Sequence, residues 1–230
     1  MLGHSVMPRF TPTAIATGLL LVAGIAGCQP GQYTSKRRAP GYQPPAQSQR
    51  TLVFRAKVST LPSGSLTEGK APDEVIEVVL PGRVYTRPLK AEPVAKRSDA
   101  DRRTPERASA SDFSAMRAGD PEWIRENYRE EDYPQIKGFV EEASMRKMNQ
   151  GVFRGFGQKT IVARCTYKDL VLVFVQYDDA RDKGMVEAYQ KVQSDWKRTT
   201  TLADDETVAV LLSAFRTGEL VEQQTKAPNP

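Results

Sequence analysis

Two acidic clusters are the residues best suited to bind a metal ion. Glu130–Asp132 contains three consecutive carboxylates, and Asp178, Asp179 and Asp182 lie close together further along the chain. Carboxylate oxygens are preferred ligands of Ca²⁺, but neither stretch has the alternating aspartates of a calcium-binding loop. We therefore predict no metal site. Residues 178–182 are expected in a solvated hairpin loop, and residues 130–132 at the end of one helix and the start of the next.

The segment Gly151–Gly157 is dense in glycine, as are loops that bind phosphate groups. Such loops follow a β-strand, whereas this segment is expected to follow a helix. We interpret it as a flexible connection between a helix and a strand, with Phe153 and Phe156 in the core. These patterns identify no cofactor and no catalytic residue.

The N-terminal segment, residues 1–27, has the composition of a secretory signal. Arg9 precedes an apolar run from Ala14 to Ala26, which is shorter than the ~20 apolar residues of a membrane-spanning helix. The run ends in Ile25-Ala26-Gly27-Cys28, which resembles the lipobox of bacterial lipoproteins. The resemblance implies cleavage between Gly27 and Cys28, a diacylglycerol on the Cys28 sulfur and a fatty acyl chain, such as palmitate, on the new amino group. The alternative is an ordinary signal peptide with a chance cysteine.

The resemblance also implies a location. Two or three acyl chains on Cys28 would anchor the protein firmly, with the membrane as its first partner. Gln29, rather than aspartate, follows the cysteine, and this is similar to the sorting pattern of Gram-negative outer-membrane lipoproteins. We expect a lipid-anchored protein of the bacterial cell envelope, at the outer membrane and facing the periplasm.

Removal of the signal would leave few residues for nucleophilic or metal chemistry. His4 is the only histidine of the chain, so the mature protein could use neither a Ser-His-Asp triad nor a histidine-bound metal. With Cys28 acylated, Cys165 would be the only free thiol, and no intramolecular disulfide could form. Cys165 shares a predicted strand face with Ile161 and Ala163, and we expect it to be a small buried hydrophobe.

Charge is distributed unevenly along the chain. Residues 28–107 contain 15 lysines and arginines against 8 acidic residues, whereas residues 108–230 contain 17 against 20. The basic half lies next to the predicted anchor, where it could be attracted to anionic lipid headgroups. Nucleic acid is not an expected partner, because the protein is predicted to be exported and has no basic motif interleaved with aromatic residues.

Composition divides the chain into six segments. We predict a signal at 1–27, a disordered tether at 28–50, a small β-rich segment at 51–90, a linker at 91–104, an α+β domain at 105–220 and a tail at 221–230. The tether is rich in Gln, Pro and Gly and has too few apolar side chains to fold. The β-rich segment is either a separate unit or a set of extra strands on the main domain, and Pro81-Gly82 is expected to end its second strand.

Helical signals begin at Thr104. Thr104-Pro105 and Asp120-Pro121 each combine an N-cap with a proline in the first turn, and Gly119 is expected to end the first helix. A third helix is predicted to start at Asp132 and end at Gly151. Acidic residues at 204–206 precede a C-terminal helix that extends to about residue 217.

Strand-like patterns occupy the region between these helices. Lys159–Tyr167, Leu170–Tyr177 and Met185–Val192 are predicted to form antiparallel hairpins, followed by a short strand that begins near Trp196. The second run is apolar on both faces and should be the central strand. The fold class is therefore α+β, with N-terminal helices packed on a curved antiparallel sheet, a disordered tether and a C-terminal helix.

Two stretches support a family resemblance. Phe113–Asp120 is similar to the first helix and Ala-Gly-Asp turn of the nuclear-transport-factor-like (SnoaL-like, cystatin-like α+β) superfamily, and Tyr189–Lys197 to its penultimate hairpin. The resemblance implies a cone-like sheet around an apolar pocket. Its acid and base candidates would be Tyr167, Tyr177, Tyr189 and Asp169, although no motif assigns a catalytic role to any of them. The expected pocket-lining residues are Phe113, Trp123, Phe139, Tyr167, Phe174 and Tyr189.

Three functions agree with these patterns. The first is a non-enzymatic envelope lipoprotein that binds a small apolar ligand or an envelope protein. The second is a structural lipoprotein that docks a partner through its sheet face, and exposed apolar residues within 170–192 would favour it. The third is a histidine-free enzyme of the SnoaL or isomerase type, which requires a carboxylate with a shifted pKa inside the cone.

Overall fold

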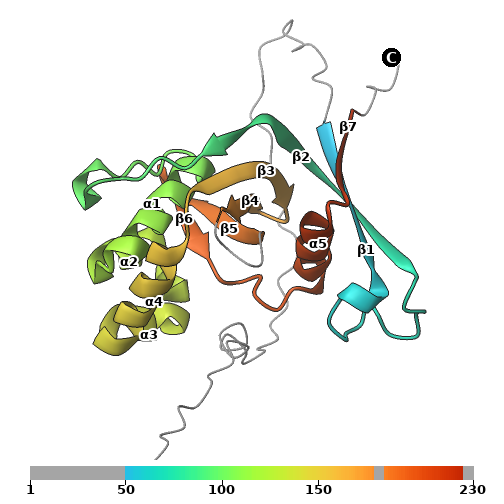
Figure 1. The fold of residues 1–230 in the computed structure, drawn as a ribbon, viewed down its shortest axis with the longest axis horizontal. Coiled ribbons are helices and arrows are strands. Elements are labelled where there is room, and N and C mark those ends of the chain that lie inside the picture. The colour runs from blue at the N-terminus through green and yellow to red at the C-terminus, as the bar shows by residue number, and fades with distance from the viewer. Residues whose placement is uncertain (1–49, 179–183, 225–230) are drawn as a thin grey trace, which may run out of the picture. The chain divides into compact units, whose positions relative to one another are not determined.

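The computed structural model of this protein describes residues 50–178 and 184–224. Within these residues the chain forms five α-helices and one seven-stranded sheet, in which neighbouring strands pair antiparallel. The predicted fold class, α+β with helices packed on a curved antiparallel sheet and a C-terminal helix, is confirmed (Figure 1). The predicted signal, Cys28 and residues 28–49 of the predicted tether lie outside the described residues.

Four consecutive strands form the predicted meander. They are β3 (Lys159–Tyr167), β4 (Leu170–Tyr177), β5 (Met185–Val192) and β6 (Asp195–Thr199). The β3–β4 hairpin turns at Lys168-Asp169, and Lys168 adopts the left-handed φ of 56° that a tight hairpin turn needs. Strand β4 is buried on both faces, as its continuous apolar run predicts.

Strand β2 (Val75–Lys90) changes partner in its middle. It pairs with β1 (Arg50–Lys57) as far as Pro81 and with β3 from Gly82 onward. The prediction that Pro81-Gly82 ends the strand is therefore wrong. Proline lacks a ladder donor, and here it lies where one ladder stops. Glycine permits a close approach, because a Cβ on Gly82 would lie 2.6 Å from the Arg164 carbonyl oxygen.

The sheet curls around the C-terminal helix α5 (Glu206–Thr217). The strand order is β6-β5-β4-β3-β2-β1-β7, so β1 and β4 are three steps apart, or about 14 Å in a flat sheet. Nevertheless, the rings of Phe54 in β1 and Phe174 in β4 stack with centroids 5.3 Å apart. Phe215 of α5 packs edge-on against Phe174, also at 5.3 Å. A core cluster that contains Phe54, Phe174 and Phe215 lies on this face of the sheet.

Four helices lie over the meander on the other face (Figure 1). They are α1 (Pro105–Ala118), α2 (Pro121–Asn127), α3 (Tyr133–Glu141) and α4 (Ala143–Gly155). The side chains of Thr104 and Asp120 cap α1 and α2 as predicted, and Gly119 ends α1 with a left-handed φ of 67°. Asp205 caps α5 by accepting from the amides of Thr207 and Val208.

The predicted third helix is wrong in its extent, because the chain breaks at Glu142 and continues as α4 through Gly151. Glu142 is extended (φ −86°, ψ 113°), which lets α4 fold back on α3. Gly138 lies at this contact, where a Cβ would be 3.0 Å from the Met145 sulfur and the flexible methionine would have to shift slightly. Asp132 does not cap α3 with its side chain. Instead its Oδ1 accepts hydrogen bonds from Thr200.

Two further features differ from the sequence-based expectation. The predicted shared face of Ile161, Ala163 and Cys165 is wrong, because a bulge at Val162 turns Ile161 toward α1 while Ala163 and Cys165 pack on the α5 side. Residues 221–224, expected in a tail, belong to strand β7 (Leu220–Gln224), which pairs with β1. Cys165 is buried as predicted, and burial raises the pKa of its thiol to about 12.

Candidate functional site

Two adjoining open pockets lie beside the N-terminal end of α1. Their volumes are about 430 and 600 Å³, and Arg83 and Arg164 line both. Together we call them the arginine groove, and we refer mainly to six of its lining residues: Arg83, Tyr85, Glu106, Arg164, Val171 and Trp196. Volumes of this size accommodate a small molecule.

A wide bulge in β2 opens the groove. Val84 pairs with Ala163 and Leu89 with Ile161, so residues 85–88 of β2 lie opposite a single residue of β3. The surplus residues move away from β3, which bends the strand locally. Side chains on both sides of this bulge, from Arg83 to Lys90, line the larger pocket together with residues of α1.

Glu106, in the first turn of α1, holds the floor of the groove together. Its carboxylate accepts hydrogen bonds from the Tyr85 hydroxyl and from Arg164, the latter at 2.9 Å. Burial alone would raise the pKa of Glu106, but these two partners lower it. Burial and the bond to Glu106 raise the pKa of Tyr85 to about 12. At neutral pH the floor is therefore an ion pair with a neutral phenol.

Arg83 lies directly opposite Arg164 in the ladder between β2 and β3. The Arg83 guanidinium lies over the Tyr85 ring, 5.0 Å from its centroid. Among the residues that the structure describes, no carboxylate forms an ion pair with Arg83. One side of the groove thus presents two guanidinium groups, with Glu106 bound to only one of them.

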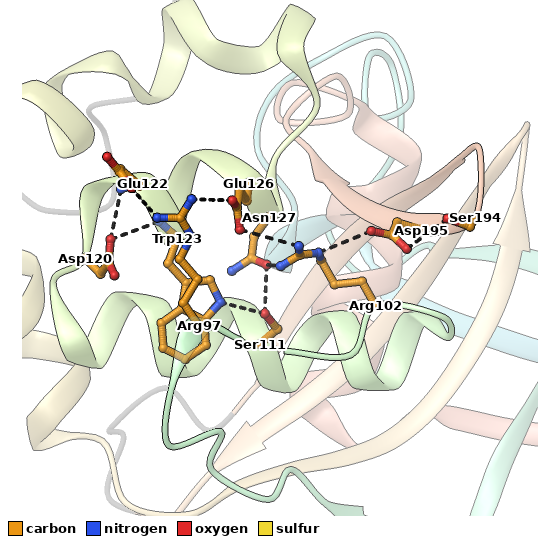
Figure 2. A network of polar contacts seen from close by, with 10 residues as sticks. All are labelled: Arg97, Arg102, Ser111, Asp120, Glu122, Trp123, Glu126, Asn127, Ser194 and Asp195. Atoms are coloured by element: carbon orange, nitrogen blue, oxygen red, sulfur yellow. Dashed lines mark hydrogen bonds and ion pairs between the residues drawn. The ribbon is translucent and has the colours of Figure 1, made fainter. Parts of the chain in front are cut away.

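A polar network joins the segment that precedes α1 to α2 and to the β5–β6 hairpin (Figure 2). Asp99, Asp101 and Thr104 of the groove belong to this segment. Arg97 pairs with Glu122 and Glu126 of α2. Arg102 is mostly buried, and it donates to Asn127, pairs with Glu126 and lies 3.5 Å from Asp195 at the start of β6.

The same network continues into the helices. The Trp123 indole donates to Ser111, whose hydroxyl donates to Asn127 at 2.8 Å. The Arg102 carbonyl also accepts from the Trp196 amide at 2.7 Å. The segment expected to be a linker is therefore tied to α1, α2 and the β5–β6 hairpin, and it supplies Asp99, Asp101 and Thr104 to the groove.

A second constellation lies beneath α1 and is closed. Lys159 and Glu187 form a fully buried ion pair at 2.8 Å, and Lys159 also donates to the Ser109 carbonyl. The hydroxyls of Ser109 and Tyr189 donate to the Glu187 carboxylate at 2.6 and 3.0 Å. We call these residues, with Asp112 and Arg198, the buried charge cluster.

Arg198 completes this cluster from β6. It pairs with Asp112 of α1 and lies 3.9 Å from Glu187. Asp112 Oδ1 and the Tyr177 hydroxyl are buried without a hydrogen-bond partner among the described residues. The cluster thus contains as many cationic as carboxylate side chains, but these two polar atoms lack a hydrogen-bond partner.

The two carboxyl groups of the cluster have opposite pKa shifts. Burial alone would raise the pKa of Glu187, but the charges of Lys159 and Arg198 outweigh it and lower the pKa to about 2. Burial raises the pKa of Asp112, and Arg198 opposes this only partly. Such divergence is typical of acid–base pairs in active sites. However, none of these residues lines either pocket of the arginine groove.

The six predicted pocket residues are distributed over three core clusters. Phe113 of α1 and Tyr189 of β5 lie in the cluster between α1 and the sheet, Phe174 and Tyr167 face α5, and Trp123 and Phe139 pack among the helices. None of the six lines the arginine groove.

The acid and base candidates are also separated. Tyr177 and Tyr189 share a core cluster under α1. The Tyr167 hydroxyl donates to Asp205, and Asp169 accepts from Gln190.

The sequence-based reasoning did not identify Lys159, Glu187, Arg198 or Arg83. The sequence contains a signal for Glu187, because Met185, Glu187 and Tyr189 occupy every second position of a strand and so share its inward face. A charged residue on an inward face must find a buried partner. No comparable signal existed for Arg83, since its position depends on the partner change of β2.

The described residues contain no cluster of three or more side chains suited to hold a metal ion. None of the helices in that part of the chain is long and apolar enough to cross a membrane. In comparisons with known proteins, no family model, no curated protein and no solved structure matches the chain.

Proposed function

We propose that this protein is a membrane-anchored lipoprotein of the bacterial cell envelope, and that it acts as a non-enzymatic binding module through the arginine groove. The observation that most directly supports binding is an open groove, to which the segment tied to α2 through Arg97 and Arg102 contributes lining residues. Among the described residues, the only constellation with divergent carboxyl pKa values is buried beneath α1. Catalysis would need access to that constellation, whereas binding needs only the groove.

The anchor part of the proposal is based on the sequence. Ile25-Ala26-Gly27-Cys28 resembles a lipobox, and Gln29 favours the outer membrane. In this proposal the described domain faces the periplasm on a tether of about twenty residues. The resemblance of residues 105–200 to the nuclear-transport-factor-like superfamily stays a prediction.

The anchor is tested with Cys28→Ser in a Gram-negative host grown with labelled palmitate. The unsubstituted protein should take up label and fractionate with the outer membrane. The variant should lose the label and leave the membrane fraction, whereas Cys165→Ser should change neither result. Equal labelling of Cys28→Ser and the unsubstituted protein would exclude Cys28 as the lipidation site.

Binding is tested by filling the groove. Thr166 lines the smaller pocket, so Thr166→Trp should displace any compound that copurifies from envelope extracts and is detected by native mass spectrometry. Thr86→Trp adds the same side chain at an exposed position of the bulge and should retain the compound. Retention in both variants would show that binding does not occur in the groove.

A second candidate function is supported by a separate surface. Val53 of β1 pairs with Val79 of β2 and Val221 of β7, and the latter two are 51% and 45% exposed. This valine row could dock an envelope partner, although it lies outside residues 170–192, where the sequence-based hypothesis placed the docking face. A photocrosslinking residue in place of Val79 should then capture one specific partner in cells, whereas the same residue in place of Glu68 should not.

A further inference from the structure

The arrangement of charge in the arginine groove points to a missing counter-ion. Like charges directly opposite on neighbouring strands destabilise a sheet, and Arg83 and Arg164 form such a pair. Glu106 neutralises Arg164, but no described carboxylate pairs with Arg83. An anion between the two guanidinium groups would remove this repulsion.

The four acidic side chains of the groove, Glu92, Asp99, Asp101 and Glu106, all line the larger pocket, and the last two already have hydrogen-bond partners. Glu106 is bound to Tyr85 and Arg164, and Asp101 accepts hydrogen bonds from Arg103 and Arg107. The smaller pocket is lined by three arginines and no acidic residue. Planar guanidinium groups bind carboxylate and phosphate oxygens in pairs, which a lysine cannot reproduce.

The other side of the smaller pocket is apolar. Trp196 of β6 and Val171 of β4 are half-buried there, and Pro105 of α1 adjoins them. The hydrogen bond from the Trp196 amide to the Arg102 carbonyl holds the backbone at this residue. A ring or short chain joined to the anion could pack against the Trp196 indole.

We infer that the groove binds a small organic anion, with a carboxylate or phosphate group between Arg83 and Arg164 and an apolar group against Trp196. This inference rests on the proposed binding function and specifies the chemical class of its ligand. A volume of about 430 Å³ is sufficient for an anion of one ring.

The test uses the full chain, purified in a neutral detergent, with benzoate and phenyl phosphate as probes. Trp196 and Trp123 are the only tryptophans, and Trp123 is buried away from the groove, so binding should change the fluorescence of Trp196. Calorimetry gives the affinity independently. Comparison of the two probes distinguishes a carboxylate from a phosphate ligand, while benzyl alcohol tests whether the anion is needed.

Arg83→Gln is the decisive variant, and Arg87→Gln is its matched control. Arg87 lies on the same strand, is exposed and lines neither pocket. Loss of charged hydrogen bonds should weaken binding of at least one probe about tenfold or more in Arg83→Gln. Arg87→Gln should change affinity less than twofold. Arg83→Lys, which keeps the charge but not the fork, should lie between them.

Stability provides a second readout. Since Arg83→Gln removes a like-charge pair, its melting temperature without ligand should equal or exceed that of the unsubstituted protein. A failure to fold is then not an explanation for lost binding. Equal affinity of Arg83→Gln and the unsubstituted protein, or the absence of binding of both anions, would overturn the inference.

The outcomes separate this inference from the proposed function. If benzyl alcohol or another neutral compound binds in the groove as tightly as the anions, the ligand class is wrong and the binding function stands. If native mass spectrometry detects no copurifying compound on either the unsubstituted protein or Thr166→Trp, the binding function itself fails.

Discussion

At the scale of single residues, the buried charge cluster places the Lys159–Glu187 ion pair entirely out of water. Removing an ion from water costs several kcal/mol, which only good geometry and further hydrogen bonds can offset. The Glu187 carboxylate accepts such hydrogen bonds from Lys159, Ser109 and Tyr189. Replacement of one partner leaves the other charge buried and unpaired.

Glu187→Gln should therefore lower the free energy of unfolding by about 3–5 kcal/mol. Urea denaturation at pH 7 measures it. The control is Glu77→Gln, which removes one partner of the exposed pair with Arg55 and should cost less than about 1 kcal/mol. Similar losses in both variants would contradict the central role of the buried pair.

The same residue should contribute to acid sensitivity. The pKa of Glu187 is about 2 in the folded protein, below its usual value of 4.5. Its stabilisation is therefore complete above pH 4.5 and is lost as the pH falls toward 2. The difference in unfolding free energy between the unsubstituted protein and Glu187→Gln should shrink over this interval. A difference that stays constant from pH 5 to pH 2.5 would refute the assignment.

At the scale of elements, glycines decide how closely strands and helices approach each other. Gly82 lies where β2 changes partner, and a Cβ there would contact the backbone of β3. Gly151 lies inside α4, and nothing lies within 4 Å of the position of a Cβ. The two positions should thus respond oppositely to the same substitution.

Gly82→Ala should reduce the free energy of unfolding by about 1–3 kcal/mol, because the strands must separate to admit the methyl group. Gly151→Ala should increase it by up to about 1 kcal/mol, since alanine is the better helix former. Thermal unfolding of both variants checks the signs. A stabilising Gly82→Ala would show that β2 can move without cost.

The local elements were predictable from sequence where their signals are local. Thr104, Asp120 and Gly119 define helix ends by short-range hydrogen bonds and backbone geometry, and Lys168-Asp169 defines a two-residue hairpin. The break at Glu142 was missed, because it depends on the packing of α4 against α3. The bulge at Val162 was missed for a similar reason: one extra residue reverses the face of Ile161.

At the scale of the whole molecule, the site was less predictable than the fold. The arginine groove combines residues of β2, β3, β4, β6 and α1. Arg83 and Arg164 are brought together only by long-range strand pairing, which no local pattern encodes. The six aromatic residues expected to line a pocket lie instead in or against three core clusters, and the groove opens elsewhere.

The edge strand β7 should be necessary for the stability of the whole sheet. The Glu222 carboxylate accepts from the Val84 amide and pairs with Arg50, so β7 connects β1 and β2. A chain that ends at Glu219 should melt at a lower temperature and elute as larger species, because an uncovered strand edge pairs with other chains. A chain that ends at Gln224 is the control. Equal melting and elution of the two chains would contradict this role.

The pairing of β1 with β7 also has a consequence for the timing of folding. Arg50 and Glu222 are 172 residues apart in sequence yet share an ion pair. A chain that emerges from a ribosome or a secretion channel with its N-terminus first therefore presents β1 long before β7 exists. This edge of the sheet can close only after nearly the whole chain has emerged. Strand β1 can pair with β2 early, but Leu52 and Phe54 are buried in a core that includes Phe174 and Phe215, so their burial waits for long-range closure.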